Sequence, residues 1–169
     1  PGAGRPAKLY RRAAREFEVS LPDRRYDLAG WLLASAVTNA ERERVSVGEA
    51  LARIARQVGE SLGAEARARA GERPSGRALV TAAGHVLEEF GYDPRRHAKG
   101  IELANCPFHA LSRDYTDLVC GMNLQLLAGM VAGLGHAGLE AYLDPAPGRC
   151  CVLLGAPPQG KNRKAAAGS

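Results

Sequence analysis

Four cysteines are the residues of this chain best suited to chemistry, and all of them fall in one stretch of the sequence. Cys120 follows Cys106 after 13 residues, and the adjacent pair Cys150 and Cys151 comes 29 residues further on. Thiolates bind soft metal ions, hold iron–sulfur clusters and attack disulfides. A thiol can also act simply as a small apolar side chain in a core. We therefore expect either a metal or redox centre or four core residues.

The spacing of these cysteines gives only weak support for a metal site. Zinc and ferredoxin sites usually contain close Cys-x2-Cys pairs, and this chain has none. Cys120 shares a helical face with apolar positions 124, 127 and 131, which favours a core role. Neighbours on a strand point to opposite faces, so one of Cys150 and Cys151 should face inward unless a bulge also turns the other. We expect the inward residue to be Cys151.

Cys106 stands before a proline, which is favoured at the first position of a helix. This predicts that Cys106 lies at or beside a helix N-terminus, where the helix dipole favours a thiolate. His109 follows three residues later and would point the same way on one helical turn, so it is a candidate metal ligand. The alternatives are a buried structural role for Cys106 and a surface or capping role for His109.

No catalytic constellation accompanies the cysteines. The sequence contains no His-Glu-x-x-His motif, no nucleophile elbow and no glycine-rich phosphate loop. A thiol–imidazole pair of Cys106 and His109 would lack an orienting third group. We therefore predict that the domain is not an enzyme, and a thiol-dependent enzyme is the weakest alternative.

The elements that would position these residues are predicted to be helices first, then strands interleaved with helices. Ser46 and Glu49 form a capping box before the second helix, and Leu28, Trp31 and Leu32 recur at helical spacing in the first. This order is typical of an α+β fold in which N-terminal helices pack on a small, mostly antiparallel sheet, with a short wing-like β segment near the N-terminus. The predicted helices span residues 25–44, 46–62, 76–90 and 114–134, and residues 64–70 are helical by propensity but expected to be exposed or frayed. The predicted strands span residues 7–11, 101–104, 139–143 and 150–154.

Length and charge place limits on the class of protein. A chain of 169 residues fits one domain, and its first residue is Pro1, so we expect a piece of a longer protein. Of the net charge of +5, residues 1–25 contribute +4 and the tail from residue 156 contributes +3, which leaves −2 on the body. The body is therefore not predicted to read DNA. No apolar run approaches the roughly 20 residues that span a bilayer, and no signal segment opens the chain, so we expect a cytoplasmic protein with no membrane association.

Four phrases of the sequence, in order, resemble one family. Residues 4–10 (GRPAKLY) resemble the wing of the winged helix-turn-helix in predicted ArsR-like bacterial transcriptional regulators. Residues 105–109 (NCPFH), 119–124 (VCGMNL) and 147–152 (PGRCCV) resemble the C-terminal half of the same group. The group includes the Suf-operon repressors, in which similarly placed cysteines bind an iron–sulfur cluster that controls operator binding.

This resemblance implies an organisation and a set of partners. It makes residues 1–22 the end of the wing and a linker, 23–155 an effector and dimerisation domain, and 156–169 a disordered basic tail. The recognition helix would precede the wing and lies outside this chain. Arg5 and Lys8 are expected to contact the DNA backbone. A homodimer is expected because operators of such regulators are usually palindromic.

The resemblance also implies a cofactor and a mechanism. Cys106, Cys120 and Cys151 would hold an iron–sulfur cluster, and the fourth ligand would be Cys150, His109 or an outside donor. Zinc, or no metal, is the alternative. Loss or oxidation of the cluster would release the three elements that it joins, and the change would reach the DNA-binding domain through the helix at 25–44. The competing function is a regulator domain that binds a small organic ligand between helices and sheet, with structural cysteines.

Overall fold

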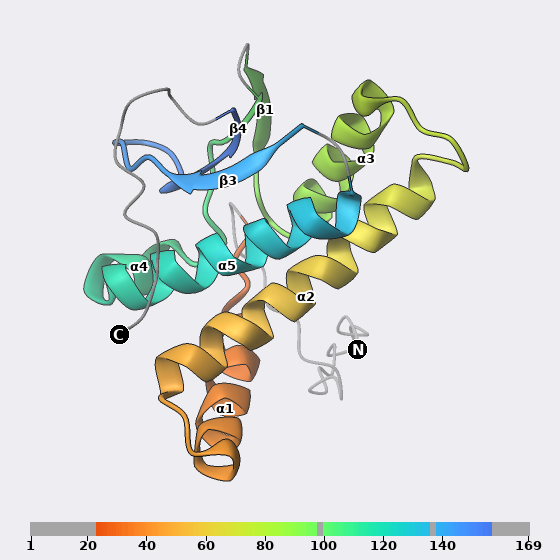
Figure 1. Ribbon diagram of the computed structural model, residues 1–169. Coiled ribbons are helices and arrows are strands. Elements are labelled where there is room, and N and C mark those ends of the chain that lie inside the picture. The colour runs from red at the N-terminus through yellow and green to blue at the C-terminus, as the bar shows by residue number, and fades with distance from the viewer. Residues whose placement is uncertain (1–22, 98–99, 136–137, 157–169) are drawn as a thin grey trace, which may run out of the picture.

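The computed structural model describes residues 23–97, 100–135 and 138–156. The predicted wing, with Arg5 and Lys8, and all but the first residue of the predicted tail lie outside these residues. Within them the fold contains five helices and four strands (Figure 1). The helices are α1 (Tyr26–Glu43), α2 (Val47–Arg69), α3 (Gly76–Glu89), α4 (His109–Asp114) and α5 (Thr116–Leu134). The strands are β1 (Pro94–His97), β2 (Gly100–Leu103), β3 (Glu140–Leu143) and β4 (Val152–Gly155).

The four strands form one antiparallel sheet in the order β1-β2-β4-β3. Alternate residues of the two central strands are buried, namely Ile101 and Leu103 on β2 and Val152 and Leu154 on β4. This period of two is what a sheet with one covered face requires. Helix α5 lies against β3 and β4, and α3 lies beside β1 (Figure 1). The predicted α+β fold with a small antiparallel sheet is therefore confirmed.

Helix α2 begins as predicted and continues through the Ala- and Arg-rich segment that follows its apolar stripe. The Ser46 side chain accepts a hydrogen bond from the Glu49 backbone N–H, and the Glu49 carboxylate accepts one from the Ser46 N–H, so the capping box is confirmed. The segment over residues 64–69, predicted to be helical by propensity but exposed or frayed, is a regular part of the helix, and its Ala66 is buried. Arg69 forms ion pairs with Glu65 on its own helix and with Glu89 at the end of α3, which joins the two helix ends.

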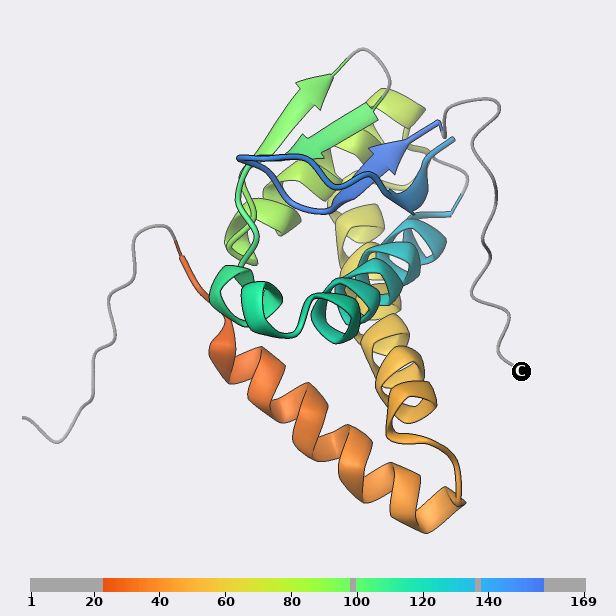
Figure 2. The ribbon, with the colours of Figure 1, turned by 90° about the vertical axis from the view of Figure 1, so that its left-hand side faces the viewer.

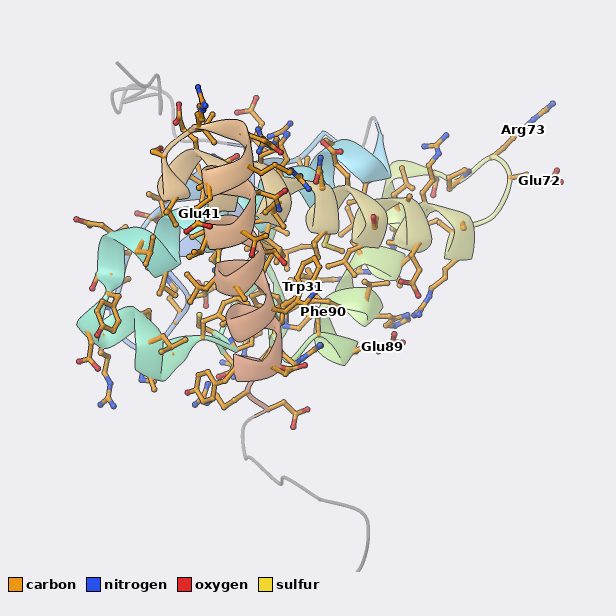
Figure 3. The ribbon with its side chains drawn as sticks, turned by 90° about the horizontal axis from the view of Figure 1, so that it is seen from below. Trp31, Glu41, Glu72, Arg73, Glu89 and Phe90 are labelled. Atoms are coloured by element: carbon orange, nitrogen blue, oxygen red, sulfur yellow. The ribbon has the colours of Figure 1, made fainter. Side chains whose placement is uncertain are left out.

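Helix α1 buries a narrower stripe than the sequence suggested. Its buried residues are Ala29, Leu32, Ala36 and Ala40, which lie on the face toward α2. Trp31, labelled in Figure 3, is 54% exposed, so the prediction that it belongs to the apolar stripe is wrong. A helix that packs mainly on one neighbour buries one side only, and Figure 2 shows α1 diverging from the rest of the domain.

Helices α2 and α5 run side by side in the same direction and approach each other backbone to backbone (Figure 1). Gly59 and Gly63 of α2 face α5, and Gly129 and Gly133 of α5 face α2. A Cβ atom at Gly59 would lie 1.8 Å from the carbonyl oxygen of Leu126. Only glycine permits backbones to approach this closely. The four glycines therefore fix both the separation and the axial register of the two helices.

Helix α5 is the most apolar element of the domain. It has 19 residues and contains an 18-residue window with a mean hydropathy of 1.4, which makes it long and apolar enough to cross a membrane by length and composition alone. Asn123 and Gln125 interrupt its apolar run, so no uninterrupted apolar run of this length exists, but the average over the helix remains high. In this fold α5 is the central helix, packed against α2 and the sheet, which is consistent with a soluble protein.

The glycine contact predicts opposite effects for two alanine substitutions in α5. A Cβ at Gly129 would lie 2.1 Å from the Arg56 carbonyl oxygen, whereas a Cβ at Gly121 would meet nothing within 4 Å. Gly129→Ala should lower the free energy of unfolding by about 3 kcal/mol, because backbone must move to admit the methyl group. Gly121→Ala should raise it by roughly 0.5–1 kcal/mol through helix propensity. Urea unfolding followed by far-ultraviolet circular dichroism measures both, and equal effects of the two changes would contradict the contact.

Candidate thiol site

The four cysteines come from three separate segments of the fold. Cys106 lies in the loop between β2 and α4, and Cys120 lies in the second turn of α5. Cys150 and Cys151 form a bend directly before β4. Because β2 and β4 are antiparallel neighbours, the end of one lies beside the start of the other, and the Cys150 N–H donates to the Leu103 carbonyl at 2.8 Å. All four thiols are free.

The structure brings the four sulfur atoms into a chain of contacts. The thiols of Cys106 and Cys151 both interact with Cys150 strongly enough to shift its pKa, and Cys120 acts in the same way on Cys151. Cys106, Cys120 and Cys150 are buried, and Cys151 is half-buried. The sequence placed these residues on separate elements, and the fold joins them at one end of the sheet.

The negative charge of this cluster belongs on Cys150 rather than on Cys106. Hydrogen bonds from Cys106 and Cys151, with smaller contributions from the Val152 backbone N–H and the Asn123 amide, lower the pKa of Cys150. The hydrogen bond to Cys150, together with burial, raises the pKa of Cys106, and the same two causes raise that of Cys151. The prediction of a thiolate at Cys106 is therefore wrong, because its neighbour Cys150 takes the charge.

The predicted orientation of the cysteine pair is also wrong. Cys150 is 1% exposed and follows the same alternation as buried Val152 and Leu154, so it faces inward, while Cys151 is only half-buried. Strand β4 begins at Val152 rather than at Cys150. The bend before it, held by a hydrogen bond from the Asp144 N–H to the Cys151 carbonyl at 2.8 Å, lets both sulfur atoms reach the cluster.

His109 is not among the partners of the four thiols. Helix α4 begins at His109 with Phe108 as its N-cap, so Cys106 and Pro107 lie in the preceding loop and not on the first helical turn. His109 is exposed at the helix start, whereas Cys106 is buried. The predicted alignment of Cys106 with His109 is therefore wrong, because the helix starts two residues later than Pro107.

Asn123 and Tyr92 belong to this site, and sequence reasoning missed both of them. The Asn123 Nδ2 group donates to the Cys150 sulfur at 3.2 Å, and its Oδ1 atom accepts from the Tyr92 hydroxyl at 2.5 Å. Burial raises the pKa of Tyr92 well above its ordinary value, so it remains a neutral donor. The available signal was an amide three residues after Cys120, on the same face of an otherwise apolar helix.

The loop that contains Cys106 is bonded to the start of α1. Arg24 donates from Nη1 to the Asn105 side-chain oxygen at 2.7 Å and to the Cys106 carbonyl at 2.8 Å. The Arg25 N–H donates to the Pro107 carbonyl at 3.1 Å. The Asn105 amide in turn donates to the Gly91 carbonyl at 2.5 Å, at the end of α3. A movement of Cys106 must therefore disturb residues 24 and 25.

The four cysteine sulfur atoms are donors of the type that soft metals prefer. They are not arranged around a single point. Among residues 23–97, 100–135 and 138–156, no three His, Cys, Asp or Glu side chains converge closely enough to hold a metal ion as they stand. Four thiols in a largely dry environment are nevertheless the ligand set that iron–sulfur clusters and zinc prefer. A bound group would have to draw the sulfur chain around a common centre.

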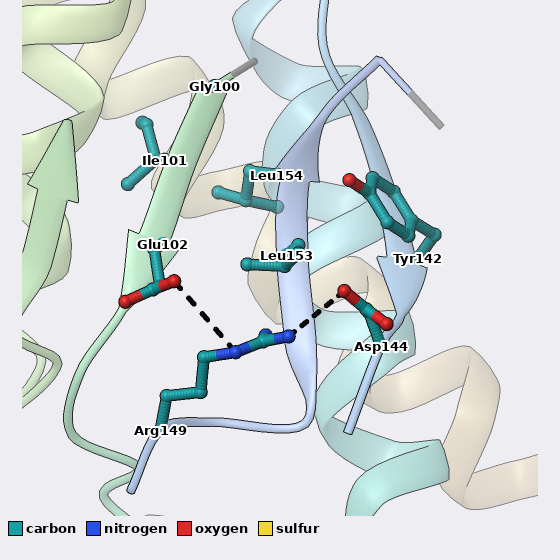
Figure 4. A pocket seen from close by; sticks show the side chains of 8 residues that line it. All are labelled: Gly100, Ile101, Glu102, Tyr142, Asp144, Arg149, Leu153 and Leu154. Carbon is teal, nitrogen blue, oxygen red and sulfur yellow. Dashed lines mark hydrogen bonds and ion pairs between the residues drawn. The ribbon is translucent and has the colours of Figure 1, made fainter. Parts of the chain in front are cut away.

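A second candidate region is a small hollow on the opposite face of the sheet (Figure 4). It has a volume of about 210 Å³, and its floor includes Tyr142 and Leu153. Arg149 extends across it between the carboxylates of Asp144, at 2.9 Å, and Glu102, at 3.8 Å. The charges in this hollow are therefore already paired with one another. The hollow also lies outside the layer between helices and sheet where a ligand was expected.

Comparisons with other proteins add no assignment to this geometry. No protein-family model, no curated protein and no solved structure matches the chain. The argument for function therefore depends on the residues of the thiol site and on the segments that they connect.

The lowered pKa of Cys150 predicts one thiolate in the folded, metal-free protein at pH 7. An unfolded chain has an ordinary thiol pKa of about 8.5, so its thiols are almost entirely protonated at that pH. The folded protein should show the ultraviolet absorbance of one thiolate, which disappears on unfolding at constant pH and is also lost as the pH falls through the folded pKa. Cys150→Ala should remove this absorbance and Cys120→Ala should retain it. An unchanged signal in Cys150→Ala would place the charge elsewhere.

Proposed function

We propose that this chain is the sensory domain of a bacterial transcriptional regulator, in which the thiol site couples iron–sulfur cluster or redox state to DNA binding. One observation carries the proposal. Four thiols from three segments lie near one another at the edge of the core, and the loop that contributes one of them is bonded to Arg24 and Arg25, immediately before α1. The resemblance of the cysteine phrases to ArsR-like regulators supplies the class of protein.

The proposed ligands are the four cysteines, with Cys106, Cys120 and Cys151 as the principal set and Cys150 as the fourth. An iron–sulfur cluster bound there would supply one-electron redox chemistry and sensitivity to oxidants. Zinc is the alternative occupant, and it would supply structure without redox chemistry. The surrounding core excludes water from three of the four thiols, and a dry shell of this kind tunes the redox potential of a bound group.

The coupling would act at the first turn of α1. Binding would stabilise the arrangement in which the Cys106 loop, α5 and the lead into β4 are held together, at the expense of arrangements in which they separate. Arg24 and Arg25 bond directly to that loop, and the predicted linker and wing immediately precede them. A shift of the loop would then change the orientation of the DNA-binding segment that precedes α1 in sequence. The change would not have to be transmitted along the length of α1.

We propose operator DNA and a second copy of the chain as partners, in the cytoplasm. Arg5 and Lys8 would contact the DNA backbone, and the two-fold of a palindromic operator would match a homodimer. The exposed side chains of Trp31 and Val37 give α1 apolar surface that such a dimer could cover. We propose no catalytic role for the thiol site: among the residues that the structure describes, no histidine contributes to the pKa of Cys150 as a neighbouring base would.

The proposal predicts the spectrum of protein reconstituted with iron and sulfide without oxygen. The wild-type chain should show visible charge-transfer absorption together with bound iron and acid-labile sulfide. Cys106→Ser, Cys120→Ser and Cys151→Ser should each abolish that absorption, because each removes a soft ligand that serine does not replace. His109→Ala is the matched control and should retain it. Retained absorption and iron in all three serine variants would overturn the assignment.

The coupling predicts the exchange behaviour of the first turn of α1. Asn105→Ala removes one of the two acceptors of Arg24 and leaves the Cys106 carbonyl, so the amides of residues 26–30 should exchange with deuterium about tenfold faster, as expected for a loss of roughly 1.4 kcal/mol. Reconstitution should slow exchange in this turn of the wild type and have little effect in the variant. Asn39→Ala, at the far end of α1, is the control. Equal responses of Asn105→Ala and wild type to reconstitution would remove the proposed connection.

A further inference from the structure

Among the described residues, Asn123 is the only polar or charged residue that is buried as deeply as the hydrophobic core residues. It is 1% exposed. It lies on α5, between Met122 and Leu124 in sequence and one helical turn after Cys120. Burying an amide without partners costs roughly 2–7 kcal/mol, so a core position for asparagine requires that both of its ends be bonded. Every buried side-chain nitrogen and oxygen in the described residues has a partner, and Asn123 is no exception.

The two partners of Asn123 have different chemistry. Its carbonyl oxygen accepts from the Tyr92 hydroxyl at 2.5 Å, and its amide nitrogen donates to the Cys150 sulfur at 3.2 Å. A thiolate or a metal-bound sulfur can only accept a hydrogen bond, so the amide must present its N–H side to Cys150. Tyr92, itself buried, holds the opposite end and thereby fixes which side of the amide faces the sulfur.

We propose that Asn123, oriented by Tyr92, is a positioning residue that holds the Cys150 sulfur in place through an N–H···S hydrogen bond and so sets how tightly the thiol site binds its metal. This proposal rests on the proposed function for the metal itself, but the hydrogen bond exists in the metal-free protein. The chain of contacts runs Tyr92–Asn123–Cys150, and it connects the end of α3 with α5 and with the segment before β4. These are elements that the four thiols alone do not all reach, because none of the thiols lies on α3.

A positioning role of this kind has a known size. Outer-shell partners that orient metal ligands typically contribute 10- to 100-fold to metal affinity. Removal of the amide should therefore weaken binding by about this factor. Removal of the tyrosine hydroxyl should have a smaller effect of the same sign, because the amide remains but is free to turn. Neither change removes a sulfur, so both variants should still bind metal at higher concentration.

The first experiment follows the Asn123 side-chain amide by nuclear magnetic resonance in metal-free, reduced, 15N-labelled protein. Cys150→Ala should shift this resonance and Gln125→Leu, on the same helix, should not, and Tyr92→Phe should speed exchange of its two protons with solvent. An unchanged chemical shift of the Asn123 side-chain amide in Cys150→Ala would overturn the proposal, whether or not the protein binds a metal.

The second experiment measures binding of Cd2+ alone, by its thiolate charge-transfer absorption. Asn123→Leu should weaken binding by about 10- to 100-fold, and Tyr92→Phe by a smaller factor. Gln125→Leu removes an amide from the same helix at a half-buried position and is the matched control, which should bind as the wild type does. Equal weakening in Gln125→Leu, or unchanged affinity in Asn123→Leu, would overturn the positioning role.

The two experiments separate this proposal from the one that it rests on. If the wild type fails to bind Cd2+, iron or zinc, the proposed function fails, together with the claim about affinity. The amide resonance still decides whether Asn123 holds Cys150. If the wild type binds Cd2+ and the amide variants bind equally well, the proposed function stands and the positioning role falls. Thermal unfolding of each variant confirms that the comparison is made between folded proteins.

Discussion

The close contact between α2 and α5 is the constraint on which the rest of the domain depends. Carbonyl oxygens of one helix occupy the places where Cβ atoms of the other would stand, at Gly59 and Gly63 and again at Gly129 and Gly133. Such a contact permits neither sliding nor rotation of one helix against the other without a backbone clash. Because α5 supports the sheet on its other side, its fixed position also determines where β3 and β4 can lie.

The geometry of the thiol site depends on the contact between α2 and α5. Cys120 and Asn123 lie in the first half of α5, ahead of the glycines, so their direction is set by the rotation of the helix. The other two segments reach them because β2 ends where β4 begins, which brings Cys106 and the Cys150–Cys151 bend to the same end of the sheet. The site thus joins elements whose relative positions the core already determines, which is how a functional site is kept rigid.

Local chemistry could be predicted from the sequence, and pairings between distant residues could not. The capping box at Ser46 follows from side chains three residues apart, and it was confirmed. Trp31 was misplaced because periodicity shows that a stripe exists but does not tell how many neighbours will cover it. The start of α4 was misplaced because Pro107 suits a turn as well as a first helical position. The bond between Tyr92 and Asn123 spans 31 residues and depends on how the segment after α3 lies against α5, which no local pattern reveals.

The exposure of Trp31 affects how this protein must be observed. It is the only tryptophan in the chain, and it already faces solvent in the folded state. Its emission will therefore change little when the core melts, and intrinsic fluorescence is a poor measure of global stability here. The same indole lies on the helix whose first turn is bonded to the Cys106 loop. Its fluorescence therefore reports mainly on the surface of α1 and should change when another molecule covers that helix.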